Sequence, residues 1–143
     1  MWEHPTSGER ATAFYLRLER CVKLQHNTQN QGNQLGQVEM QQCIEDCMSC
    51  YNVCIQTAKA CQQAGGEHAE QGHIWMLLDC AEICQTAAHF MEHNNPLYGY
   101  VTSAAAQVTM HCNEQCLQMG DNDCANACMN ASWSLQQISK MVP

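Results

Sequence analysis

The spacing of the cysteines constrains the fold of this chain more than any other feature. Five of its 12 cysteines follow one another at helical intervals, from Cys43 through Cys47, Cys50 and Cys54 to Cys61. At about 100° per residue, an α-helix places these thiols within an arc of about 60° along roughly 27 Å of its axis. A narrow stripe with this repeat faces the interior of a helix bundle. The sequence therefore predicts thiols where Leu and Ile normally pack.

Composition and chain breaks favour an all-α fold. The 143 residues are enough for one domain with a core, and they are rich in Gln, Asn, Ala and Met but contain only two Phe. The pair Gly65-Gly66, the Asn-Asn-Pro sequence at 94–96 and the single Gly120 divide the cysteine-rich part into helical segments. We expect the carboxylate of Asp121 to cap the last segment. The predicted helices span residues 38–63, 69–93, 97–119 and 122–141.

The chain divides into two parts at residue 36. Residues 1–36 contain a modest amphipathic pattern over 11–25 and then a polar, glycine-punctuated stretch, which predicts an N-terminal helix and a linker. Residues 37–143 contain the four predicted helices with short connections. The predicted fold is therefore an antiparallel four-helix bundle with a cysteine-lined lumen, plus an extra N-terminal helix.

Every predicted bundle helix presents sulfur to the lumen. Antiparallel pairing brings the thiols of different helices to similar heights, toward the turns at Gly65 and Gly120. The opposite end, near Pro96, is expected to contain hydrocarbon from Met91, Val101, Leu135 and Ile138, and Val108 is also expected on the inward stripe of the third helix. The inward cysteines of the second, third and fourth helices are Cys80 and Cys84, Cys112 and Cys116, and Cys124 and Cys128.

Charge and hydropathy limit the partners. The formal net charge of −8 favours cations as ligands and argues against nucleic acid, because there is no basic stripe to contact phosphates. We see no stretch apolar enough for a membrane span and no signal peptide, so a cytoplasmic protein is expected, with a trimmed export signal left open. A secreted disulfide scaffold is disfavoured because thiols leaving one helix side by side have poor disulfide geometry.

Thiols on four facing stripes predict a soft-metal site. Thiolates select Cu(I), Zn(II) or iron-sulfur clusters. Tetrathiolate zinc or iron-sulfur sites each carry about two negative charges, which are costly to bury in series, whereas Cu(I) at about one ion per thiolate is nearly neutral. A Cys-x₃-Cys pair on one helix can clasp one linearly coordinated ion. Such pairs occur at Cys43/Cys47, Cys50/Cys54, Cys80/Cys84, Cys112/Cys116 and Cys124/Cys128.

The same segments resemble a known family. The run CIEDCMSCYNVCIQTAKAC, the segment DCAEIC and the pair HCNEQC and DCANAC look like the bacterial copper storage proteins and the wider cysteine-rich four-helix copper-binding family. The resemblance covers about residues 41–140 and implies a bundle that stores or sequesters several Cu(I) ions per chain. The ligands it implies are Cys43, Cys47, Cys50, Cys54, Cys61, Cys80, Cys84, Cys112, Cys116, Cys124 and Cys128, with His73 and Met119 as candidates near an open end.

Two alternatives stay open at this point. One is an iron-sulfur or other electron-transfer protein, with Cys80, Cys112, Cys116 and Cys128 as a cross-helix ligand set. The other is a structural protein with an inert cysteine core or a few Zn(II) sites. No general base, nucleophile and orienting acid are recognisable together, so we do not expect an enzyme. A copper chaperone or small-thiol donor, a homo-oligomer, and the role of Cys21 also stay open.

Overall fold

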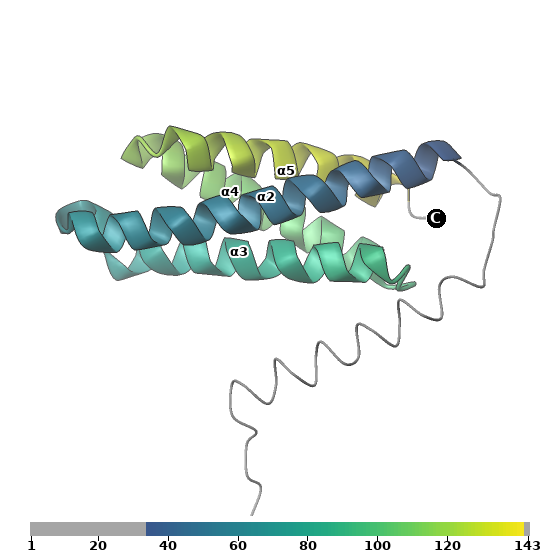
Figure 1. Ribbon diagram of the computed structural model, residues 1–143, viewed down its shortest axis with the longest axis horizontal. Helices are drawn as coiled ribbons and strands as arrows, with labels where there is room; N and C mark the ends of the chain where they lie inside the picture. The colour runs from purple at the N-terminus through teal and green to yellow at the C-terminus, as the bar shows by residue number, and fades with distance from the viewer. Residues whose placement is uncertain (1–33, 142–143) are drawn as a thin grey trace, which may run out of the picture. The chain divides into compact units, whose positions relative to one another are not determined.

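The structure, a computed structural model, describes residues 34–141, and this part of the chain folds into a four-helix bundle (Figure 1). The described residues contain no strand. The predicted all-α four-helix fold is therefore confirmed. The helices are α2 (Gln34–Ala64), α3 (Gln71–Glu92), α4 (Tyr98–Met119) and α5 (Asn122–Lys140), and the short 3₁₀-helix η1 (Gly66–Ala69) joins α2 to α3.

Most predicted helix boundaries agree with the structure to within two residues. The exception is the start of α2, which begins at Gln34, inside the stretch predicted as a linker. The predicted N-terminal helix over residues 11–25 and Cys21 lie outside the described residues. The division of the chain at residue 36 stays a prediction.

Glycine and asparagine in left-handed conformations end the helices. Gly120 adopts φ 77° after α4, and the N–H of the next residue, Asp121, donates to the Cys116 carbonyl at 2.9 Å. A residue without a Cβ enters this conformation at little cost. Asn94 (φ 49°) has the same role after α3. These reversals keep the connections short and make successive helices antiparallel.

The four helices form a closed ring around one core. Helix α2 contacts α3 and α5, and α4 contacts the same two helices from the other side of the bundle. Figure 1 shows α2 in front, between α3 and α5, with α4 behind. All four helices therefore contribute side chains to a common lumen.

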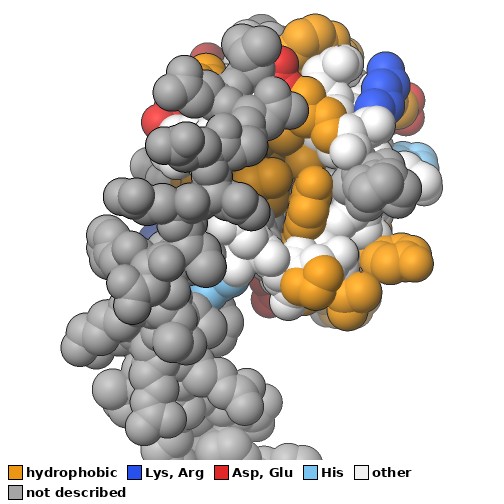
Figure 2. Space-filling view, turned by 90° about the vertical axis from the view of Figure 1, so that its right-hand side faces the viewer, with side chains coloured by type: hydrophobic (Ala, Val, Ile, Leu, Met, Phe, Trp, Pro, Cys, Tyr) orange, Lys and Arg blue, Asp and Glu red, His pale blue; other side chains and the backbone are white. Residues whose placement is uncertain are grey.

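The core is polarised along the bundle axis, as predicted. Most of the cysteines lie in the half that ends at the turns containing Gly65 and Gly120, whereas Met91, Leu135 and Ile138 are buried in the other half. Figure 2 views that second end and shows hydrophobic side chains at its surface. Burial of these aliphatic side chains stabilises the bundle through the hydrophobic effect, to which the smaller cysteine side chains contribute less.

The buried stripe of α4 differs from the prediction. Val101 and Val108 were expected to point inward but are only half-buried, whereas Thr102, Thr109 and Asn113 are buried. Their polar groups find partners: Thr109 Oγ1 donates to the Ala105 carbonyl at 2.8 Å, and Asn113 Nδ2 donates to the Ala125 carbonyl of α5 at 2.7 Å. Because these hydrogen bonds remove the cost of burial, polar residues occupy positions that hydropathy assigns to valine.

Candidate metal centre

All cysteines of the described part of the chain are buried and none forms a disulfide. Each is at most 3% exposed, and the thiols project from all four helices into the lumen. The disulfide scaffold considered above is therefore wrong for these residues. Packed next to one another, eleven thiols are a set of soft ligands rather than isolated core side chains. They are Cys43, Cys47, Cys50, Cys54, Cys61, Cys80, Cys84, Cys112, Cys116, Cys124 and Cys128.

Four sulfurs from three helices form a first group, consisting of Cys50, Cys54, Cys80 and Cys128. All four Sγ atoms lie within 4.8 Å of one another. The Sγ of Cys50 is 3.6 Å from that of Cys128 and 3.9 Å from that of Cys80. Helices α2, α3 and α5 must all be in place to assemble this group, so it is a product of tertiary packing.

A second group consists of Cys54, Cys112, Cys124 and Cys128, again with every Sγ within 4.8 Å of the others. The Sγ atoms of Cys54 and Cys124 are 3.7 Å apart. Cys54 and Cys128 belong to both groups, which makes them bridging positions. Cys116 extends the second group, since its Sγ lies 4.0 Å from that of Cys112.

The remaining lumen thiols continue the line toward the aliphatic half. Cys47 interacts through its thiol with both Cys43 and Cys84, and Cys84 also interacts with Cys50. The hydrogen bond with Cys43, followed by burial, raises the pKa of Cys47. The ten thiols other than Cys61 therefore form one continuous chain of contacts, which we call the sulfur column.

The spacing of the two groups suits a metal ion. An ion bonded to thiolates at about 2.3 Å holds four sulfurs about 3.8 Å apart, three about 4.0 Å apart, and two opposite ones about 4.6 Å apart. The separations of 3.6–3.9 Å in the first group match three- or four-coordination. Ions can therefore bind between the sulfurs with little movement of the helices.

The linear clasp predicted for Cys-x₃-Cys pairs is less well matched. The Sγ atoms are 3.9 Å apart in Cys50/Cys54 and 4.0 Å apart in Cys112/Cys116. Linear coordination needs them about 0.6 Å further apart. The shortest contact in the column joins different helices, Cys50 to Cys128. The sulfur positions are thus better suited to an ion bound by cysteines of different helices than to an ion bound by a Cys-x₃-Cys pair of one helix.

The cross-helix set suggested for an iron-sulfur cluster is spread over both groups, with Cys128 belonging to each of them. Cys80 belongs to the first group and Cys112 to the second, while Cys116 belongs to neither. The sulfurs of both groups also touch one another, whereas a multinuclear cluster must fit between its ligands. This geometry favours metal ions bound between the sulfurs over an iron-sulfur cluster.

Hydrogen bonds between thiols shift the pKa values of neighbouring cysteines in opposite directions. Bonds from three neighbours, first among them Cys128, lower the pKa of Cys50 to about 6. In the second group, hydrogen bonds led by Cys112 lower the pKa of Cys124. Hydrogen bonds led by the one with Cys112 raise the pKa of Cys128. Cys50 and Cys124 are therefore the thiols of the two groups whose pKa is lowered by their neighbours.

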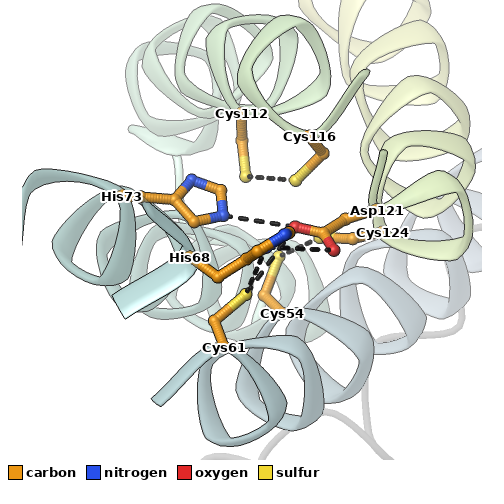
Figure 3. A network of polar contacts seen from close by, with 8 residues as sticks. All are labelled: Cys54, Cys61, His68, His73, Cys112, Cys116, Asp121 and Cys124. Atoms are coloured by element: carbon orange, nitrogen blue, oxygen red, sulfur yellow. Dashed lines mark hydrogen bonds and ion pairs between the residues drawn. The ribbon is translucent and has the colours of Figure 1, made fainter. Parts of the chain in front are cut away.

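A different set of ligands lies at the end of the bundle near Gly65 and Gly120. We call Cys61, His68, His73 and Asp121 the end group. Figure 3 shows both imidazoles directed at the Asp121 carboxylate, near the sulfurs of Cys54, Cys112 and Cys124 from the second group. His73 Nε2 is 3.2 Å from Asp121 Oδ2, and Cys61 Sγ is 3.7 Å from the same oxygen. Burial, and then the negative charge of Asp121, raise the pKa of Cys61 to about 11.

The end group corrects one expectation and refines two others. Asp121 occupies the N-cap position of α5, but its side chain makes no capping hydrogen bond and faces the histidines instead. His73 is buried on the inner side of α3, as its place on the cysteine stripe indicated. Met119 is half-buried and lines a surface hollow beside His73. His68 escaped prediction because η1 has no helical periodicity to read.

The fold and this site define a class of protein: a four-helix bundle whose lumen is built from soft-metal ligands. Comparison with known families agrees, because the sequence profile "Copper storage protein" matches residues 36–140. The chain belongs to the copper storage protein family. The family resemblance drawn from the cysteine segments is thereby confirmed.

Two other proteins are similar to this chain in structure or in sequence. The crystal structure of the Nmul_A1745 protein from Nitrosospira multiformis superposes with a TM-score of 0.71 at 30% identity, over 73% of this chain and 98% of that one. An uncharacterized cysteine-rich protein of Bacillus subtilis, YhjQ, is 27% identical over 92 residues, which are 64% of this chain and 84% of that protein. Within the described residues, no helix has the length and apolar character needed to cross a membrane.

Proposed function

We propose that this protein binds and stores several Cu(I) ions on the thiolates of the sulfur column. The observation that supports this most directly is the pair of four-sulfur groups sharing Cys54 and Cys128, at separations suited to metal-thiolate bonds. Membership of the copper storage protein family points to the same cargo. Storage in this form serves copper homeostasis and protection from free copper.

The charge of the lumen favours a monovalent cargo. Two Zn(II) ions on the six thiolates of the joined groups leave a net charge of about −2 in a dry core. Cu(I) ions bridged by the same thiolates, at about one ion per sulfur, leave almost none. A column of shared sulfurs therefore accommodates many Cu(I) ions at a lower desolvation cost than it does divalent ions.

Loading proceeds by exchange of one thiolate for another along the column. We propose that copper enters at the end formed by the Gly65 and Gly120 turns, because the sulfur-rich half of the core lies there. Cys50, with its low pKa, offers a thiolate near the middle of the column. Each further ion displaces about one proton from a neutral thiol. The histidine His73 and the thioether of Met119 lie near this entrance.

The same reasoning extends to partners and compartment. Free thiols persist in a reducing compartment, so we propose that the protein works in the cytoplasm. A copper chaperone or a small-thiol copper complex is a suitable donor, because both release Cu(I) by thiolate exchange. We propose storage without catalysis, and a homo-oligomer remains a further proposal.

Anaerobic titration with Cu(I) against a competing chelator tests the function. We expect several ions per chain, a product without visible colour, and release of about one proton per ion. Uptake of fewer than about two ions would remove the storage proposal. A brown product from cells grown with iron would instead favour the iron-sulfur alternative.

A further inference from the structure

The end group differs chemically from the sulfur column, and we propose that it is a separate site for a divalent cation of the Zn(II) type. Its four candidate ligands are one thiolate, two imidazoles and one carboxylate, from Cys61, His68, His73 and Asp121. This site would bind zinc at the end of the bundle while copper occupies the lumen.

The distances suit tetrahedral zinc. With bonds of about 2.0–2.3 Å, the ligand atoms of a tetrahedral site lie about 3.4–3.6 Å apart. His73 Nε2 and Cys61 Sγ are 3.2 and 3.7 Å from Asp121 Oδ2. His68 Nδ1 is 3.9 Å from Cys61 Sγ and 4.0 Å from Asp121 Oδ1. Cys61, His73 and Asp121 already have ligand atoms within 4.8 Å of one another, and a movement of the partly exposed His68 side chain toward them would complete the geometry.

The ligand types separate this site from the column. Carboxylate and imidazole suit Zn(II), whereas Cu(I) is selected by thiolate and thioether. A thiolate and a carboxylate together carry a charge of −2, which a divalent ion neutralises and a monovalent ion does not. The site therefore prefers a dication for the same electrostatic reason that the column prefers Cu(I).

The surroundings admit an ion from solvent. The side chain of His68 is 39% exposed and that of Asp121 is 19% exposed, so the group is open on one side. A surface hollow of about 430 Å³ adjoins His73 and carries the carboxylates of Glu67 and Glu70. These negative charges raise the local concentration of cations.

Zinc retention by copper-loaded protein tests the site. The full chain is saturated with Cu(I), incubated with Zn(II), freed of excess metal, and analysed for both metals. We expect one zinc per chain, and X-ray absorption at the zinc edge should show about one sulfur and three nitrogen or oxygen ligands. No retained zinc, or a shell of four sulfurs, would overturn the proposal.

Matched variants identify the ligands. D121N keeps the size of the side chain and removes a ligand charge, and we expect it to weaken zinc binding at least about tenfold. D123N removes the same charge from an exposed residue of the first turn of α5 and should have no effect. H73Q should act like D121N, whereas H111Q, at an exposed position, should not.

The outcome is separable from that of the copper titration. If copper is stored but D121N and D123N bind zinc equally, only the zinc site is wrong. If copper is not stored, the two variants can still be compared on copper-free protein, where a lost zinc in D121N supports the site.

Discussion

Replacing the bridging sulfur of Cys128 provides the sharpest test of how the column is organised. Cys128 belongs to both four-sulfur groups, and its Sγ lies 3.6–3.9 Å from those of Cys50, Cys54 and Cys80. Cys43 is equally buried, at 0% exposure, but belongs to neither group. C128A and C43A therefore remove the same atom from the same kind of environment, with different numbers of sulfur neighbours.

The two variants should lose similar stability in the absence of metal. Deleting one buried sulfur costs about 1 kcal/mol of transfer free energy, and a residual cavity of roughly 20 Å³ adds about 0.5 kcal/mol. We therefore expect the free energy of unfolding to fall by about 1.5 kcal/mol in each variant. Denaturant unfolding of the copper-free proteins measures this loss.

Copper binding should distinguish them. Loss of Cys43 removes one thiolate at the end of the column and about one ion, whereas loss of Cys128 deprives both groups of a shared ligand and about two ions. The assay counts the copper retained by each variant against a series of chelators of rising affinity. Equal losses at equal stability would refute the view that the two groups organise the bound copper.

Three further outcomes are expected. L135A, in the aliphatic half of the core, should lower the free energy of unfolding by about 2–5 kcal/mol. The amount of copper retained per folded chain should stay unchanged. A loss of copper in this variant would contradict the division of the core into a sulfur-rich and an aliphatic half. The pKa of Cys61 is raised from 9.0 to about 11, so its contribution to stability is complete below pH 9 and is lost as pH rises to about 11. Over this pH range the free energy of unfolding of the metal-free protein should fall, and in C61A it should fall by up to about 3 kcal/mol less. Denaturant unfolding measures both values, and an equal fall in the two proteins would contradict the raised pKa of Cys61. Native copper-free protein should react slowly with a thiol reagent because its cysteines are buried, and fast labelling of the described cysteines would disprove the packed core.

The helices and their inner faces were predictable because of periodicity. The stripe from Cys43 to Cys61 determines which side of α2 faces the lumen, and the glycines at 65, 66 and 120 mark where helices end. Periodicity was less informative on α4, where Thr102 and Thr109 took the buried positions expected for valines. Hydropathy alone does not include the hydrogen bonds that make a buried threonine inexpensive.

The site was predictable in composition but not in grouping. Thiols expected to act as pairs within a helix make their closest contact between helices, as Cys50 and Cys128 do across 78 positions of sequence. Asp121 carried a clear sequence signal for capping, yet the α4–α5 turn directs its carboxylate at His73 instead. A local motif states which interactions a residue can make, and the packing of distant segments selects among them.

The amino-acid sequence by itself determined the fold class, the family and the inward direction of the cysteines, because helical repeat and residue type are local properties of the chain. Only the tertiary structure decided which sulfurs share a group and that a thiol, two imidazoles and a carboxylate meet at one end. Ligand geometry depends on ångström-scale distances between helices, and these follow from how all four helices pack together.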